Sequence, residues 1–122
     1  MSNYIEPVEE LDASVRDNVR ALTTVKEEVE AVIWYQQRAA ACTDEQLKKV
    51  VEHNMLEEIE HACMALEWLR RNMNGWEEQL KTYLFKTQEI TEIEESGEGE
   101  REGPEGGGAV TDLGIGSLKK KE

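Results

Sequence analysis

The stretch LKKVVEHNMLEEIEHACMALEW, residues 47–68, decides how this chain folds. It contains no Gly or Pro, and one set of its residues recurs alternately four and three positions apart. That spacing is typical of the side of a helix that packs against another helix. The stretch therefore predicts a long helix whose packed seam consists of Leu47, Val51, Asn54, Glu58, His61, Ala65 and Trp68.

Two polar residues lie in the centre of that seam and form the motif Glu58-x-x-His61. An ionised carboxylate in a packed seam is costly unless it is paired or binds a metal. A single Glu or His on a helix is usually a solvated side chain, so the motif alone fits either a surface pair or a metal site. A carboxylate on a neighbouring helix would favour the metal site.

The preceding segment offers that carboxylate in Glu28. Pro7 is typical of a first helical turn, and neither Gly nor Pro follows it before Ala41, so one long helix is expected there. Glu28 lies one turn before Val32 and two turns before Tyr35, on the same face. Apolar residues recur along this segment at helical spacings, namely Val15, Val19, Leu22, Val25, Val29 and Val32.

Local signals mark where the helices begin and end. Thr43 with Gln46 has the form of a capping box, so the second helix is expected to begin there and to reach about Arg71. Residues 72–75, Asn-Met-Asn-Gly, supply a stop, and a short amphipathic helix follows over 76–85. The sequence predicts an all-α fold for residues 1–86, an antiparallel two-helix hairpin with a short C-terminal helix.

The ligand count then predicts a dimer. Di-iron sites in four-helix bundles take a Glu from each of two helices and a Glu-x-x-His from each of the other two. This chain has two long helices and supplies half of that set, in Glu28, Glu58 and His61. A two-fold dimer would complete the four-helix bundle and place four carboxylates and two imidazoles around two irons.

Charge and composition exclude several classes of protein. The formal net charge is -13 over 122 residues, and an acidic surface repels phosphate backbones, which argues against nucleic acid as a partner. Cys42 and Cys63 form neither a disulfide framework nor a zinc pattern. No apolar run approaches the roughly 20 residues that span a membrane, and the N-terminus has no signal-peptide pattern. We expect a cytoplasmic protein.

The C-terminal third differs in composition. Residues 89–112 carry nine acidic residues against Arg101 alone and are rich in Gly. Segments with little to bury stay disordered, so residues 87–111 are predicted to be an acidic linker. Residues 112–122 then contain a short apolar island, Leu113-Gly114-Ile115-Gly116-Ser117-Leu118, followed by three lysines. By itself this island also fits a disordered terminus.

Several runs resemble the encapsulated ferritin family. They are Glu27–Tyr35 (EEVEAVIWY), His53–His61 (HNMLEEIEH), Leu66–Asn72 (LEWLRRN) and Tyr83–Phe85 (YLF). The similarity covers about the first 85 residues in order, and the island at 113–118 separately resembles encapsulin cargo-loading peptides. One departure is Ile33, where members of the family carry an Asp before the Trp-Tyr pair.

The resemblance implies a ferroxidase centre with Glu28, Glu58 and His61 as ligands from both subunits and Tyr35 beside it. It implies a site through which iron enters at Glu27, Glu30 and Trp34, which can also hold calcium or another divalent cation. It further implies an outward-facing metal site at His53, Glu57 and Glu60. From the residues alone, the entry set fits a solvated acidic face equally well, the outer set fits a surface His beside acidic residues better than a metal site, and Tyr35 fits a buried tyrosine.

The expected function is oxidation of Fe(II) to Fe(III) by O2. Carboxylate oxygens with imidazole suit iron and favour Fe(III). The resemblance adds assembly as a ring of dimers, typically a decamer, inside an encapsulin nanocompartment that stores the iron. Two alternatives stay open: a non-catalytic helical adaptor, and another di-iron enzyme of the rubrerythrin type, against which the lack of a Cys-x-x-Cys motif argues.

Overall fold

A computed structural model describes residues 3–101, with side-chain surroundings for residues 3–96. Every regular element in this part of the chain is helical, as the sequence predicts. The chain divides into two compact units, residues 1–69 and residues 70–122. None of the helices in the described range is long and apolar enough to cross a membrane.

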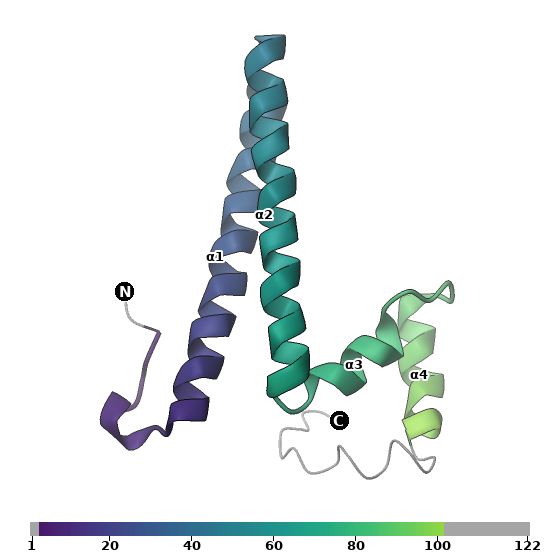
Figure 1. The fold of residues 1–122 in the computed structure, drawn as a ribbon. Helices are drawn as coiled ribbons and strands as arrows, with labels where there is room; N and C mark the ends of the chain where they lie inside the picture. Colours follow the sequence, from purple (N-terminus) through teal and green to yellow (C-terminus); the bar gives the residue numbers. More distant parts are fainter. Residues whose placement is uncertain (1–2, 102–122) are drawn as a thin grey trace. The chain divides into compact units, whose positions relative to one another are not determined.

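The first unit is a hairpin of two long helices, α1 (Ala13–Ala41) and α2 (Glu45–Asn72), which lie side by side and antiparallel (Figure 1). A 3-10 turn, η1 (Val8–Glu10), precedes α1. The buried residues of these two helices are apolar, namely Ala39 on α1 and Val51 and Leu69 on α2.

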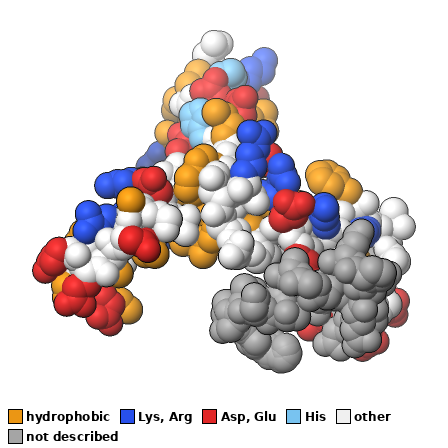
Figure 2. All heavy atoms as spheres, turned by 60° about the horizontal axis from the view of Figure 1, so that its bottom comes forward, with side chains coloured by type: hydrophobic (Ala, Val, Ile, Leu, Met, Phe, Trp, Pro, Cys, Tyr) orange, Lys and Arg blue, Asp and Glu red, His pale blue; other side chains and the backbone are white. Residues whose placement is uncertain are grey.

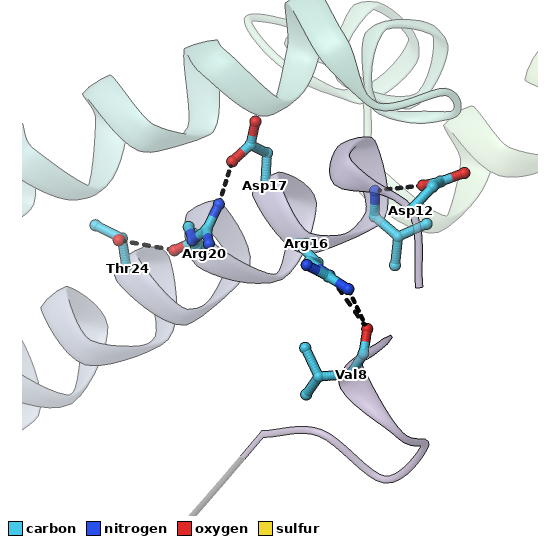
Figure 3. A network of polar contacts seen from close by, with 7 residues as sticks. Val8, Asp12, Arg16, Asp17, Arg20 and Thr24 are labelled. Atoms are coloured by element: carbon cyan, nitrogen blue, oxygen red, sulfur yellow. Dashed lines mark hydrogen bonds and ion pairs between the residues drawn. The ribbon is translucent and has the colours of Figure 1, made fainter. Parts of the chain in front are cut away.

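The first long helix begins later than the sequence predicts. Pro7 precedes only the short turn η1, and α1 starts at Ala13 because the Asp12 side chain accepts a hydrogen bond from the backbone N–H of Val15. Figure 3 shows this cap and the neighbouring contact in which the guanidinium of Arg16 donates to the carbonyl oxygen of Val8 at 2.6 and 3.1 Å. These bonds hold η1 against α1.

The start of the second helix is displaced by one residue from the predicted capping box. The Asp44 carboxylate, rather than the Thr43 hydroxyl, accepts a hydrogen bond from the backbone N–H of Leu47 at 2.8 Å. Asp is a strong N-cap residue, and it places Glu45 in the first turn, where a negative charge complements the helix dipole.

The predicted seam of α2 is only partly covered within one chain. Val51 is buried and Glu58 is half-buried, but Leu47 and Trp68 at the two ends of the seam are exposed. On α1, Val15 and Val29 of the predicted apolar face are likewise exposed. A single hairpin therefore leaves apolar surface beside its buried residues.

The second unit contains α3 (Trp76–Tyr83) and α4 (Ile90–Arg101), which pack against each other. Gly75 precedes α3 with a φ of 103°, a left-handed conformation that favours glycine. The helix α4 lies where the sequence predicts a disordered linker, so that prediction is wrong for residues 90–101. Glu89 accepts a hydrogen bond from the N–H of Glu92, and Ile93 is buried, so this stretch has both a cap and an apolar anchor.

Candidate metal centre

Three side chains predicted as metal ligands converge at mid-height of the hairpin. His61 Nδ1 lies 3.3 Å from a carboxylate oxygen of Glu58 on the same helix and 3.7 Å from one of Glu28 on α1. One ligand atom from each residue lies within 4.8 Å of the others. Within the described residues, this is the one group of three or more such side chains that could hold a metal ion.

Helix geometry explains why these residues meet. Glu58 and His61 are three residues apart and therefore neighbours on the surface of α2. Glu58 is seven residues after the buried Val51 and eleven before the buried Leu69, so it lies on the same face of α2 as both. On α1, Glu28 meets this pair through its contacts with His61 and Glu58.

The surroundings of Glu28 disfavour the charge of its carboxylate. The pKa of Glu28 is raised, chiefly by its hydrogen-bonding approach to the Glu58 carboxyl and further by desolvation and repulsion, while His61 acts in the opposite direction. A cation between the two carboxylates would remove this repulsion, because an opposite charge favours the ionised form. The two carboxylates thus concentrate negative charge that a metal ion would compensate.

The cluster is open on one side. The side chain of His61 is 48% exposed, whereas those of Glu28 and Glu58 are 23% and 24% exposed. Figure 2 shows both histidines at the surface of the hairpin, among acidic and apolar side chains. Coordination positions on the exposed side are therefore available to ligands from outside the chain.

The donor set suits a hard or borderline cation and is incomplete. Two carboxylates and one imidazole fit iron, zinc or manganese. Three protein ligands leave positions unfilled for any of these metals, since even tetrahedral structural sites use four. The described residues of a single chain therefore supply fewer ligands than a closed structural site needs.

Tyr35 is half-buried, two turns after Glu28 on the same face of α1. The guanidinium carbon of Arg38 lies 5.2 Å from the centre of its ring, which is within the range of a cation–π contact. Arg38 is not among the residues predicted from the sequence. Its spacing of three residues from Tyr35 predicts that the two side chains are neighbours on a helix.

The residues predicted to admit iron lie on the exposed surface of α1. Glu27, Glu30 and Trp34 are all exposed, and they form no cluster of three metal ligands within the described chain. Their spacing keeps them on one side of the helix, as the sequence predicts.

Two of the three residues predicted to form the outward-facing metal site, His53, Glu57 and Glu60, are in contact. His53 Nε2 lies 3.1 Å from a carboxylate oxygen of Glu57, one turn later on α2, and both side chains are exposed. Glu60 is also exposed and does not join them in a three-ligand group. This pair by itself is equally typical of a solvated helix surface.

The remaining predicted features are the two cysteines, Ile33 and the C-terminal segments. Cys42 and Cys63 are free thiols, and Cys42 is half-buried whereas Cys63 is exposed. Ile33, at the position where the sequence departs from the resembled family, is also exposed. The linker residues 102–111 and the peptide at residues 112–122 lie outside the described part of the chain.

Comparisons with known proteins point to one family. The EncFtn-like family pattern matches residues 3–87. A ferritin-like protein from Thermotoga maritima is 56% identical over 115 residues, spanning 94% of this chain and 96% of that protein. An encapsulated ferritin-like protein from Rhodospirillum rubrum is 49% identical over 120 residues, spanning 93% of this chain and 86% of that protein.

A solved structure agrees with the sequence comparisons. The crystal structure of a protein from Nitrosomonas europaea superposes with a TM-score of 0.71 at 46% identity, covering 73% of this chain and 98% of that chain. Hairpin, ligand cluster and relatives all support one conclusion. This chain belongs to the EncFtn-like family of encapsulated ferritin-like proteins.

Proposed function

We propose that this protein is a ferroxidase that oxidises Fe(II) to Fe(III) with O2 at a di-iron centre formed between two copies of the chain. The observation that carries the proposal is the cluster of Glu28, Glu58 and His61, with ligand atoms within 4.8 Å of one another. Its donor types are those of di-iron carboxylate proteins.

A second copy would complete the cluster. A two-fold axis beside the exposed edge of His61 would bring a second Glu28, Glu58 and His61 to the first set. The resulting four carboxylates and two imidazoles match the ligands of a di-iron site in a four-helix bundle. The exposed seam residues Leu47 and Trp68 support this association, because a dimer on this side would cover them.

The protein residues would act by binding and positioning iron as the substrate. Carboxylates stabilise Fe(III) more than Fe(II), which favours the loss of one electron from each iron to O2. Two irons held close together allow a two-electron reduction of O2 within one site. Tyr35, on the same face as Glu28, would lie beside the reacting metals, and Arg38 over its ring would hold it there.

Two surface sets would supply iron to this centre. Glu27 and Glu30 with Trp34 form an exposed acidic strip on α1 next to the face of Glu28, suited to attract Fe(II) or calcium before it reaches the centre. His53 and Glu57, with Glu60 one turn further, offer an outward-facing site of the same donor types. Both assignments come from the family resemblance and are compatible with the exposure of these side chains.

The product would be stored in an encapsulin compartment. A small helical oligomer has little room for a mineral of its own, and one relative carries the name encapsulated ferritin-like protein. Residues 113–118, Leu-Gly-Ile-Gly-Ser-Leu, would dock to the shell as a targeting peptide. A ring of dimers, such as a decamer, would present several of these peptides at once and strengthen docking.

Stopped-flow measurement of Fe(II) oxidation tests the proposal. Glu58→Gln removes one negative ligand while keeping side-chain volume, and it should lower the initial rate by about tenfold or more. Glu52→Gln is the matched control, because Glu52 is a half-buried glutamate on the same helix, outside the cluster. Equal rates for wild type, both variants and buffer would instead identify a non-catalytic adaptor.

A further inference from the structure

An N-terminal strap, defined here as residues 3–11, runs beside α1 (Figure 1). The side-chain amide of Asn3 donates a hydrogen bond to the hydroxyl oxygen of Thr23 at 2.9 Å, and its carbonyl oxygen accepts one from the ammonium of Lys26 at 2.9 Å. The bonds that hold η1 against α1 anchor the other end of the strap (Figure 3). A single polar side chain thus binds two side chains that lie 20 and 23 positions further along the chain.

Asn3 contacts α1 directly before the entry strip, defined here as Glu27, Glu30 and Trp34. Thr23, to which Asn3 donates, is four residues before Glu27 and therefore lies one turn earlier on the same face of the helix. The strip continues that face, because Glu30 and Trp34 follow Glu27 at spacings of three and seven residues. Asn3 therefore occupies the turn of α1 next to the residues that are expected to admit iron.

Lys26 is the positive charge on α1 that is best placed to block the strip. Side chains three or four residues apart on a helix are neighbours, and Glu30 is four residues after Lys26. The other neighbouring positions hold the uncharged residues Leu22, Thr23 and Val29. Both Lys26 and Glu30 are exposed, so nothing buried separates them. An ammonium paired with Glu30 would compensate the negative charge that attracts a metal ion.

The ammonium of Lys26 binds Asn3 instead. It donates to the carbonyl oxygen of the Asn3 side chain, and no ion pair among the described residues involves Glu30. A hydrogen bond from an ammonium group is charge-assisted and is stronger than one between neutral groups. Asn is itself uncharged, so it occupies the ammonium and leaves the negative charge of the strip unchanged.

We propose that Asn3 is a positioning residue that holds the ammonium of Lys26 away from Glu30 and so keeps the entry strip free for divalent cations. This inference rests on the proposed function, in which the strip admits iron to the metal centre. Without Asn3, the flexible side chain of Lys26 would turn along α1 and pair with Glu30. The strap thus sets how tightly the strip binds a cation, and it does so through Lys26 alone.

Titration of the full-length protein with Tb³⁺, a luminescent ion that binds oxygen ligands as calcium does, tests this inference. Tb³⁺ emits light when a nearby tryptophan is excited, so the part of the emission that is lost in Trp34→Phe measures binding at the strip. Asn3→Ala should weaken this binding by about threefold, which is the size of effect expected of one exposed ion pair. The double variant Asn3→Ala/Lys26→Met, which lacks the ammonium, should bind as tightly as Lys26→Met.

Two further measurements separate the position of Lys26 from general effects of charge and stability. Lys49→Met removes the same charge from an exposed lysine near the start of α2, and adding it to Asn3→Ala should not restore binding. In Fe(II) oxidation, Asn3→Ala should raise KM by about threefold and leave kcat unchanged, because the ligands of the metal centre are intact. A fall in kcat would mean that the strap supports the fold of the centre, which would contradict the proposal.

Glu30→Gln distinguishes a failure of this inference from a failure of the proposed function. If Glu30→Gln weakens Tb³⁺ binding at the strip but Asn3→Ala does not, the strip binds cations and only the role of Asn3 is wrong. The role of Asn3 is also wrong if the loss in Asn3→Ala persists when Lys26 is replaced by Met. If Glu30→Gln binds Tb³⁺ like the wild type, the strip is not a cation site, and both the entry assignment and this inference are overturned.

Discussion

His61 Nδ1 on α2 lies 3.7 Å from a carboxylate oxygen of Glu28 on α1, and this contact joins the two helices at the ligand cluster together with the approach of Glu28 to Glu58. The residues are 33 positions apart, so their proximity depends on the register of the whole hairpin. On α2, the buried Val51 and Leu69 share one face of the helix with Glu58.

Replacing Glu28 by Gln should remove the stabilisation of the fold by Fe(II), but it should not lower the stability of the protein without metal. The pKa of Glu28 is raised by its hydrogen-bonding approach to Glu58, by desolvation and by repulsion from Glu58, so its ionised form is disfavoured. The metal-free variant should melt at the same temperature as the wild type or higher. Anaerobic Fe(II) should raise the melting temperature of the wild type but not that of Glu28→Gln; an equal rise in both would exclude Glu28 as a ligand.

The cap of α1 should make stability depend on pH through Asp12. Hydrogen bonds from the N–H of Val15 and from Ser14 lower the pKa of Asp12 below its ordinary value of about 3.9. A carboxyl group whose pKa is lower in the folded than in the unfolded state stabilises the fold at pH values above its unfolded pKa. This stabilisation is lost as the pH falls through the folded pKa. Asp12→Ala should therefore lower the melting temperature at pH 7, and this difference should shrink below about pH 4.

Asp12→Asn is the matched control for that experiment. Asn keeps a capping oxygen but has no charge. The difference in melting temperature between Asp12→Asn and Asp12→Ala should therefore stay constant with pH. If the difference in melting temperature between the wild type and Asp12→Ala is also constant between pH 7 and pH 3, the charge of Asp12 contributes nothing to stability.

Leu69→Ala should destabilise the hairpin by about 2–5 kcal/mol, because it leaves a cavity at the most buried side chain described, which is 0% exposed. Urea denaturation of the metal-free protein measures this free energy of unfolding. Ile5→Ala, at an exposed position, should change it by less than about 0.5 kcal/mol. Similar values for the two variants would mean that Leu69 is not part of a packed core.

Deleting residues 112–122 should abolish loading into encapsulin shells while leaving Fe(II) oxidation at the wild-type rate. The deleted segment contains the apolar island at residues 113–118 and none of the ligands. Co-expression with the shell protein, followed by purification of intact shells, measures the loaded fraction. Wild-type loading by the shortened chain would refute the assignment of a targeting peptide.

The sequence predicts the hairpin well because its signals are repeated many times along two long helices. Six apolar residues between Val15 and Val32 recur at helical spacing, so a single misplaced signal does not change the prediction. The ligand set is predictable for a related reason: a Glu-x-x-His motif brings its two residues together in any helix. The pairing with Glu28 needs only the antiparallel register.

The predictions that are wrong depend on single local contacts. The start of α1 depends on the Asp12 cap, and the start of α2 depends on Asp44, each chosen from several residues able to cap a helix. The helix α4 depends on one buried residue, Ile93, in a stretch whose composition is typical of disorder. Spacing identifies the seam of α2 as one face of the helix, but it does not identify the partner that covers Leu47 and Trp68.

Iron stoichiometry measured by native mass spectrometry, as a function of protein concentration, tests most directly whether two chains share one centre. With anaerobic Fe(II), monomers should carry no iron, dimers should carry two, and the oxidation rate per chain should rise with protein concentration. Monomers that bind iron and oxidise it at a concentration-independent rate would contradict the account.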